Sequence, residues 1–270
     1  MVSVGHVVLV GAGNMGGALL SGWLANGIAG SSVTVIDPSP SEAMQAMISK
    51  AGATHHSTLP DGLAADILFL AVKPQLMEKV LPGLKPLVGE TTVVVSIAAG
   101  TTLAFLTRQL GEAGMVRAMP NTPAMIGRGV TGAYANPKVS DAQRDAVQAL
   151  LKVSGPVEWV SSEADIDSVT AVSGSGPAYV FYLVECMAEA GRKLGLPEDV
   201  AMRLARETVS GAGELLNRSP DIASKLRQNV TSPGGTTAAA LSVLMADDGM
   251  QPLFDKALEA ARTRAQELGG

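Results

Sequence analysis

The stretch Val7-Val8-Leu9-Val10-Gly11-Ala12-Gly13-Asn14-Met15-Gly16 decides the fold of this chain. Its four apolar residues predict a short buried strand, and its three glycines have the G-x-G-x-x-G/A spacing of a dinucleotide-binding turn. The first glycine permits a sharp turn, the second leaves space for a pyrophosphate, and the third lets a helix pack closely on the strand. A helix that begins at Asn14 would direct free N–H groups at this anion.

A second strand supports this interpretation of the glycine turn. Val33-Thr34-Val35-Ile36 is apolar enough for a buried strand, and Asp37 follows it directly. An acidic residue about 20 residues beyond the glycine turn is where a dinucleotide-binding fold holds the ribose diol. The order of strand, glycine turn, helix, strand and acid therefore predicts the first half of a Rossmann-type domain.

Strand-like and helical patterns alternate up to about Glu163, which predicts an α/β fold with a doubly wound parallel sheet. The ligand of such a sheet lies at the carboxyl ends of its strands, where Gly11, Asp37, Lys73 and Ala98 all fall. The segment around His55 and His56 is polar and is not among the expected strands. The expected strands cover residues 7–10, 33–36, 67–72, 92–97, 115–119, 130–135 and 157–160.

Beyond Glu163 the sequence has helical patterns and no further strand-like run. Pro177 and Pro197 each stand where a helix begins, since proline suits the first helical turn. We therefore expect a dinucleotide-binding domain over residues 1–163 and an all-helical domain over residues 164–270. Ala and Gly occur on both sides of these helices, which gives more apolar surface than so small a domain can bury. The sequence predicts that this domain interlocks with the same domain of a second chain.

The composition argues against several classes of function. The net charge is −5 without a long basic run, which argues against nucleic acid or an anionic membrane as a partner. No apolar run approaches the roughly 20 residues of a membrane span. One cysteine and three histidines do not make an ordinary zinc site, so we expect no metal. Cys186 lies on an apolar helical stretch, which predicts a buried, unreactive thiol, and we expect a cytoplasmic protein.

Three further loops have the composition of ligand-binding segments. In Arg117-Ala118-Met119-Pro120-Asn121-Thr122-Pro123-Ala124, two prolines fix an irregular segment after a strand, which suits one wall of a nicotinamide site or a structural turn. In Ser173-Gly174-Ser175-Gly176-Pro177, small residues before a helix leave backbone amides open to an anion, or simply cap the helix. In Val230-Thr231-Ser232-Pro233-Gly234-Gly235-Thr236-Thr237, hydroxyls and open backbone could together bind a carboxylate.

Together these motifs resemble those of the pyrroline-5-carboxylate reductase family from end to end. The matching segments are G-x-G-N-M-G at 11–16, A-V-K-P-Q at 71–75, S-I-A-A-G at 96–100, M-P-N-T-P-A at 119–124, D-x-V-T-A-x-S-G-S-G-P-A-Y at 167–179 and T-S-P-G-G-T-T at 231–237. The resemblance implies a Rossmann domain followed by a helical dimerisation domain, in a homodimer or a higher oligomer built from dimers. It also implies that each active site combines one chain's cofactor domain with helical segments of both chains.

The resemblance further implies hydride transfer from NADPH or NADH to the C=N bond of 1-pyrroline-5-carboxylate, which gives L-proline. Backbone amides of the 231–237 loop would bind the substrate carboxylate, and the Thr237 hydroxyl would donate to the ring nitrogen as the catalytic group. The substrate-binding positions are then Glu163, Ser175, Gly176, Ser232, Gly234, Gly235, Thr236 and Thr237. The cofactor-binding positions are Gly11, Ala12, Gly13, Asn14, Met15, Gly16, Asp37, Ser39, Ala71, Val72, Lys73, Pro74, Ala98, Ala99 and Asn229. Among them, Asp37 and Ser39 follow from the sequence pattern after the second strand and not from the resemblance.

Two positions depart from the family pattern. After the second strand the chain has Asp37-Pro38-Ser39, where many relatives have serine or an arginine-bearing turn. An aspartate there favours the free ribose diol of NAD and repels a 2′-phosphate, whereas Ser39 or Ser41 could donate to one. Use of both cofactors therefore stays open. Ser57-Thr58 stands where relatives often supply an asparagine to the cofactor, so that contact is open too.

Three other activities fit the sequence less well. A β-hydroxyacid dehydrogenase shares the two-domain layout but needs a catalytic lysine on the first long helix of the second domain, where Lys193 lies at the far end. A regulator that binds the cofactor without turnover has no need of a carboxylate-binding loop at 231–237. A serine hydrolase needs G-x-S-x-G and a histidine beyond it, and Ser173 stands where the first glycine would be.

Overall fold

Eight strands form one sheet within residues 4–269, the part of the chain that this computed structural model describes. They are β1 (Val7–Val10), β2 (Val33–Ile36), β3 (Thr54–His56), β4 (Ile67–Leu70), β5 (Val93–Ser96), β6 (Gly114–Pro120), β7 (Thr131–Ala135) and β8 (Val157–Trp159). Their order in the sheet is β3-β2-β1-β4-β5-β6-β7-β8. Every residue of β1, β2, β4 and β5 is buried, as expected for central strands with helices on both faces of the sheet.

Two hydrophobic cores flank the sheet, one on each face. The helices α1 (Asn14–Ala25), α2 (Glu42–Ala51) and α5 (Asp141–Leu151) close one core, and α3 (Pro74–Leu84) and α4 (Leu103–Leu110) close the other. Successive strand residues point to opposite faces, so Val7 and Leu9 pack in the first core while Val8 and Val10 pack in the second. The fully buried Trp23 of α1 contacts the ring of Phe69 edge-on. This arrangement confirms the predicted doubly wound α/β domain.

Two strands differ from the expectation. β3 forms over the polar segment at Thr54–His56, because it is an edge strand and its exposed side chains give no apolar run. β7 runs antiparallel to β6, so the sheet is not wholly parallel as predicted. The cause is the connection between them, since a short link without an α-helix returns the chain beside the strand it has just left.

The expected loop before Pro177 is helical instead. α6 (Asp165–Val169), a π-helical turn (Thr170–Gly174) and α7 (Gly176–Lys193) follow one another along the chain. The Ser175 N–H donates to Thr170 O at 2.8 Å, so this amide is used within the helix. The prediction that an open loop at 173–177 begins the long helix is therefore wrong.

The chain divides into two compact units, one with the residues up to 175 and those from 261 onward, and one with residues 176–260. This division falls later than the expected boundary at 163/164, because α6 and the π-helical turn pack on β6 and β7. A Cβ added to Gly132 of β7 would lie 2.5 Å from Cγ1 of Val169, which shows how closely α6 approaches the sheet. The functional boundary between the domains stays a prediction.

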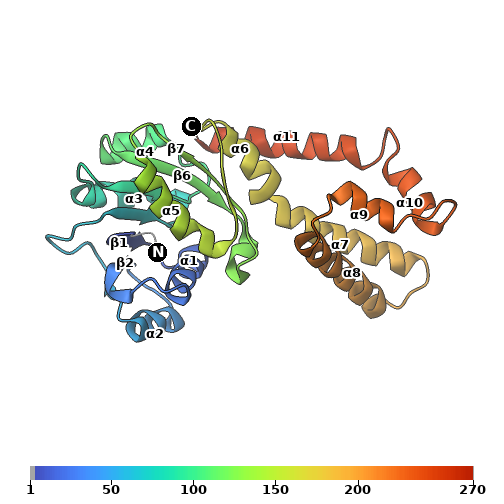
Figure 1. The fold of residues 1–270 in the computed structure, drawn as a ribbon, viewed down its shortest axis with the longest axis horizontal. Helices are drawn as coiled ribbons and strands as arrows, with labels where there is room; N and C mark the ends of the chain where they lie inside the picture. Colours follow the sequence, from blue (N-terminus) through green and yellow to red (C-terminus); the bar gives the residue numbers. More distant parts are fainter. Residues whose placement is uncertain (1–3, 270) are drawn as a thin grey trace. The chain divides into compact units, whose positions relative to one another are not determined.

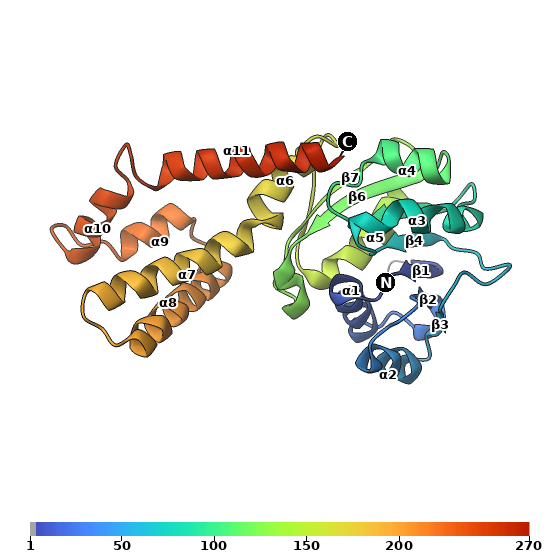
Figure 2. The same ribbon diagram turned by 180° about the vertical axis from the view of Figure 1, so that it is seen from behind.

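The helical unit leaves much apolar surface uncovered. After α7 it contains α8 (Glu198–Arg218), α9 (Ala223–Asn229), α10 (Thr236–Leu244) and the first half of α11 (Met250–Gly269). α7 and α8 lie side by side (Figures 1 and 2) along small residues such as Ala188 and Ala201, which are buried. Large side chains stay exposed, and Leu194 is 87% accessible. Cys186 of α7 is exposed as well, so the prediction of a buried thiol is wrong for the single chain.

Candidate active site

Most of the expected cofactor residues follow strands at one edge of the sheet. Gly11 follows β1, Asp37 follows β2, Ala71 follows β4 and Ile97 follows β5. These four strands are parallel neighbours, so their carboxyl ends meet at the same edge. The Gly11 N–H donates to Ile36 O at 2.9 Å and holds the glycine turn beside the end of β2. The predicted placement of these loops, at the edge where such folds bind ligands, is confirmed.

The glycine turn has the shape that a pyrophosphate needs. Gly11 has a φ of +91°, and a Cβ there would lie 2.9 Å from Ala71 O. A Cβ on Gly16 would overlap Gly11 O, so α1 packs directly on the turn. A Cβ on Gly13 would meet no atom within 4 Å, and this residue is the N-cap of α1 without a side-chain cap hydrogen bond. Open space therefore adjoins the unpaired first N–H groups of α1, and these residues fit a dinucleotide.

Asp37 is bonded to the glycine turn itself. Its Oδ2 accepts from the Ala12 N–H at 2.7 Å, and its Oδ1 accepts from the Ser39 N–H at 2.8 Å. Nε2 of His55, on the neighbouring edge strand β3, lies 2.9 Å from Asp37 O. The Ala12 amide is thereby used within the protein and is not a phosphate donor here. The ribose contact of Asp37 and the cofactor role of Ser39 stay predictions.

Two further loops border the same edge. Residues 71–74 lead from β4 into α3, whose first residue is a proline. Ala98 follows β5, and its N–H donates to Ser96 Oγ at 3.3 Å. Gly100 has a φ of +70°, and a Cβ there would lie 3.0 Å from Leu268 Cβ near the end of α11. Packing within the first unit therefore fixes the loop that contains Ala98 and Ala99, whose contact with a cofactor stays a prediction.

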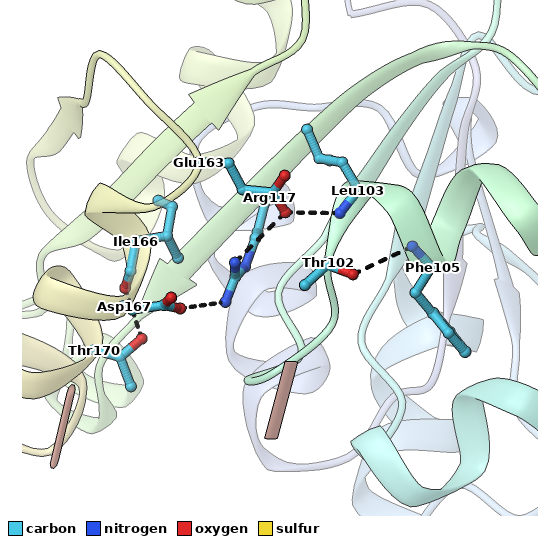
Figure 3. Close-up of polar contacts among 8 residues, drawn as sticks. All are labelled: Thr102, Leu103, Phe105, Arg117, Glu163, Ile166, Asp167 and Thr170. Atoms are coloured by element: carbon cyan, nitrogen blue, oxygen red, sulfur yellow. Dashed lines mark hydrogen bonds and ion pairs between the residues drawn. The ribbon is translucent and has the colours of Figure 1, made fainter. Parts of the chain in front are cut away.

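A buried ion-pair cluster that the sequence analysis did not anticipate lies beside α4 (Figure 3). Arg117 of β6 is 3% exposed. Its Nη2 lies 2.9 Å from Asp167 Oδ1, and its Nη1 lies 3.5 Å from Glu163 Oε1. The same Glu163 oxygen accepts from the Leu103 N–H at 2.7 Å, next to the N-cap Thr102. The cluster therefore joins β6, α6 and the amino end of α4.

The sequence did contain a signal for this cluster. The run 115–119 predicts a buried strand, and a guanidinium within such a strand needs anionic partners. Glu163 and Asp167 stand four residues apart, a spacing that places two side chains on one face of a helical segment. This signal predicts that Arg117 has acidic partners but does not identify them, because Glu163 and Asp167 lie 46 and 50 positions away in the chain. The expected contact of Glu163 with substrate stays a prediction.

The 231–237 loop makes a tight turn before α10. The Gly235 N–H donates to Ser232 O at 3.0 Å, and Gly234 has a φ of +71°. With Pro233 at the second position this is a type II turn, which requires glycine at the third. The N-cap of α10 is Gly235, which makes no side-chain cap hydrogen bond. The first-turn amides of α10, including that of Thr237, thus have no intrahelical partner, whereas the Gly235 amide is used in the turn.

The other expected site residues lie in both units. Ser175 follows the π-helical turn, Gly176 begins α7, and Asn229 ends α9. In the M-P-N-T-P segment, Asn121 Oδ1 accepts from the Val130 N–H at 3.0 Å, which closes that loop as a structural turn would. The substrate and cofactor roles of Ser175, Gly176 and Asn229 stay predictions.

Clearly shifted pKa values occur on the exposed surfaces of α7 and α8. A hydrogen bond from Arg192 lowers the pKa of Glu189 to about 2. A hydrogen bond from Arg203 lowers the pKa of Asp199. A hydrogen bond with Cys186 raises the pKa of Tyr182. These groups belong to none of the motifs above, so we assign them no chemical role.

Two kinds of arrangement are absent from residues 4–269. No group of three or more His, Cys, Asp or Glu side chains in this range could hold a metal ion. None of the helices in the same range is both long enough and apolar enough to cross a membrane. The expectation that the protein uses no metal stays a prediction.

Comparisons with known proteins cover nearly the whole chain. A family model described as pyrroline-5-carboxylate reductase dimerisation matches residues 163–268, and one described as NADP oxidoreductase, coenzyme F420-dependent, matches residues 6–100. The pyrroline-5-carboxylate reductase of Pseudomonas aeruginosa is 40% identical over 268 residues, which are 99% of this chain and 98% of that protein.

Two solved structures are similar over nearly their full length. The structure of a pyrroline-5-carboxylate reductase from Coxiella burnetii has a TM-score of 0.91 and 38% identity, and the match covers 99% of this chain and 100% of that one. The Plasmodium falciparum pyrroline carboxylate reductase with NADP bound has a TM-score of 0.79 and 30% identity, with 98% of each chain covered. These matches extend over both compact units.

Proposed function

The chain belongs to the pyrroline-5-carboxylate reductase family, and from this premise we propose that it reduces the C=N bond of 1-pyrroline-5-carboxylate to L-proline, the last step of proline biosynthesis. NADPH or NADH, when bound, supplies the hydride. The reaction asks three things of the protein, namely a dinucleotide held in place, an anchored carboxylate and a hydrogen bond to the ring nitrogen.

The first unit holds the dinucleotide in this proposal. The amino end of α1 and the glycine turn at 11–16 bind the pyrophosphate, where the open side of Gly13 leaves room for it. The loops at 71–74 and 98–99 border the ribose next to the nicotinamide. Asn229 adds a further contact to the cofactor.

The 231–237 loop anchors the substrate. Backbone N–H groups of Ser232, Gly234, Thr236 and Thr237 donate to the carboxylate, because the type II turn and the start of α10 leave amides for an anion. The Thr237 hydroxyl donates to the ring nitrogen. Ser175 and Gly176 complete the pocket.

The observation that carries the proposal is that α1 and α10 both begin without a side-chain cap directly after glycine turns of the family motifs. The test is to mix the purified protein with pyrroline-5-carboxylate and NADPH or NADH, and to follow both nicotinamide absorbance and proline. We expect one proline for each dinucleotide oxidised. Dinucleotide binding without any oxidation would overturn the proposal and favour a nucleotide-binding regulator.

Asp37 bears on the choice between the two cofactors. We propose that the chain accepts both, and that the Asp37 carboxylate weakens binding of the NADPH 2′-phosphate by charge repulsion. Asp37→Ser should raise the NADPH-to-NADH ratio of kcat/KM roughly tenfold, or about 1.4 kcal/mol. Asp145→Ser, an exposed change on α5, serves as the control. If Asp37→Ser leaves the ratio unaltered, the aspartate does not face the ribose.

The exposed apolar side chains of the helical unit support a proposal about the oligomeric state. We propose a homodimer, or a higher oligomer built from dimers, in which the dimerisation segment 163–268 covers exposed side chains such as Leu194, Ile222 and Val243. Sedimentation velocity should give a species of two chains or a multiple of two. A monomer that stays folded on dilution would remove this part of the proposal. We also propose that the protein is located in the cytoplasm.

A further inference from the structure

Arg117 is the buried centre of a charge cluster that contains one guanidinium and two carboxylates. Its side chain is 4% exposed, and those of Asp167 and Glu163 are 13% and 30% exposed. A buried guanidinium is costly unless anionic groups compensate it, and here two carboxylates do so. The surplus negative charge lies against the amino end of α4, where the Leu103 N–H and the helix dipole offset it. Protein groups therefore offset both the charge of the Arg117 guanidinium and that of the Glu163 carboxylate.

Through Glu163, the cluster fixes the loop that leads from β5 into α4. Arg117 pairs in register with Ser96, the last residue of β5, and Glu163 bonds to the first residue of α4, Leu103. The loop at 97–102, which contains the two alanines of the proposed cofactor site, lies between these anchor points. Loss of the Glu163 charge therefore loosens one end of this loop.

Through Asp167, the cluster fixes the helical segment that precedes Ser175 and Gly176. Asp167 lies on α6, whose Val169 packs into the space that Gly132 leaves on β7. This close packing and the ion pair with Arg117 both hold α6 against the sheet. The π-helical turn that follows is a rare conformation that occurs frequently at functional sites.

We propose that Arg117 is a positioning residue of the reductase, which sets the cofactor loop through Glu163 and the substrate segment through Asp167. The proposal rests on the proposed function, because the roles of 98–99 and of Ser175 and Gly176 belong to it. Arg117 is 3% exposed and touches neither ligand. This proposal replaces the expected substrate contact of Glu163, since it has Glu163 act on the dinucleotide through the Leu103 N–H at the amino end of α4.

Three conservative variants distinguish the effect of the Arg117–Glu163 pair from that of the Arg117–Asp167 pair. Glu163→Gln should raise the Kd and KM for the reduced dinucleotide about tenfold and leave the KM for pyrroline-5-carboxylate unchanged. Asp167→Asn should raise the KM for pyrroline-5-carboxylate about tenfold and leave the dinucleotide Kd unchanged. Arg117→Lys, which keeps the charge but loses the planar fork, should raise both constants. The Kd is measured by titration with NADPH followed by nicotinamide fluorescence, without substrate.

The matched control is Glu112→Gln, which removes the exposed ion pair with Lys138 (2.8 Å) in the same unit and should change neither constant. Variants that lower the melting temperature but leave both constants at wild-type values would show that the cluster only stabilises the fold. A rise in substrate KM for Glu163→Gln with an unchanged dinucleotide Kd would place Glu163 at the substrate and overturn the proposal. The dinucleotide Kd is measured without turnover. A wild-type protein that does not reduce pyrroline-5-carboxylate would therefore refute the proposed function, whereas the effect of Glu163→Gln on the dinucleotide Kd would still test the role of Glu163.

Discussion

Thr237→Ala should lower kcat about 100-fold, at the lower end of what a positioned proton donor contributes. The hydroxyl is proposed to donate to the ring nitrogen while hydride reaches the neighbouring carbon, so its loss acts on the chemical step. Thr237 lies in the first turn of α10, where alanine is well tolerated, and the helix itself should persist. The Kd for the reduced dinucleotide should stay unchanged, because the glycine turn belongs to the other unit.

Thr237→Ser is the matched variant for this prediction, since it keeps the hydroxyl and should recover most of kcat. Single-turnover measurements would show that hydride transfer, and not product release, is the step that slows. Wild-type turnover in Thr237→Ala would mean that the imine takes its proton from solvent and that the donor assignment is wrong.

Gly13→Val should raise the Kd for the reduced dinucleotide on the order of 100-fold, the factor for about 2.7 kcal/mol of lost charged hydrogen bonds. The new side chain would extend into the open side of the turn, where no protein atom lies within 4 Å. The folded protein should tolerate it, so the melting temperature without cofactor should change little. Titration calorimetry and thermal melting together measure both quantities.

Two other glycines supply a control variant and a contrasting variant for this prediction. Gly83→Val, on α3, also adds a side chain into open space and should leave dinucleotide binding intact. Gly16→Val should instead lower the melting temperature, because its Cβ would overlap Gly11 O and the turn cannot move away from β1. If Gly13→Val binds NADPH as tightly as wild type, the pyrophosphate does not lie on this turn.

The central sheet could be predicted because its strands are buried on both faces. Continuous apolar runs such as 67–70 and 93–95 are followed by loops that contain glycine, proline or alanine, and these boundaries give both the strands and the ligand-binding edge. β3 gave no such signal, because its side chains at the sheet edge are exposed. The direction of β7 depends on the connection after β6, and apolar periodicity does not report strand direction.

The candidate site was predicted in part. The glycine turn and the 231–237 loop are local backbone devices, so glycine and proline positions in the sequence reveal them. The Arg117 cluster joins residues that lie 46 and 50 positions apart in the chain, and no local pattern reports such a pairing. The π-helical turn at Thr170–Gly174 also escaped prediction, since Ser173-Gly174-Ser175-Gly176 has the composition of a loop, and the contact of the turn with β6 is not visible in the sequence.

A crystal structure of the protein with oxidised dinucleotide and L-proline tests the central claim most directly. We expect the pyrophosphate on the N–H groups at the start of α1, and the proline carboxylate within hydrogen-bond distance of backbone N–H groups at 232–237. The proline nitrogen should lie beside the Thr237 hydroxyl. A carboxylate bound away from this loop, or a nicotinamide ring directed away from proline, would contradict the account.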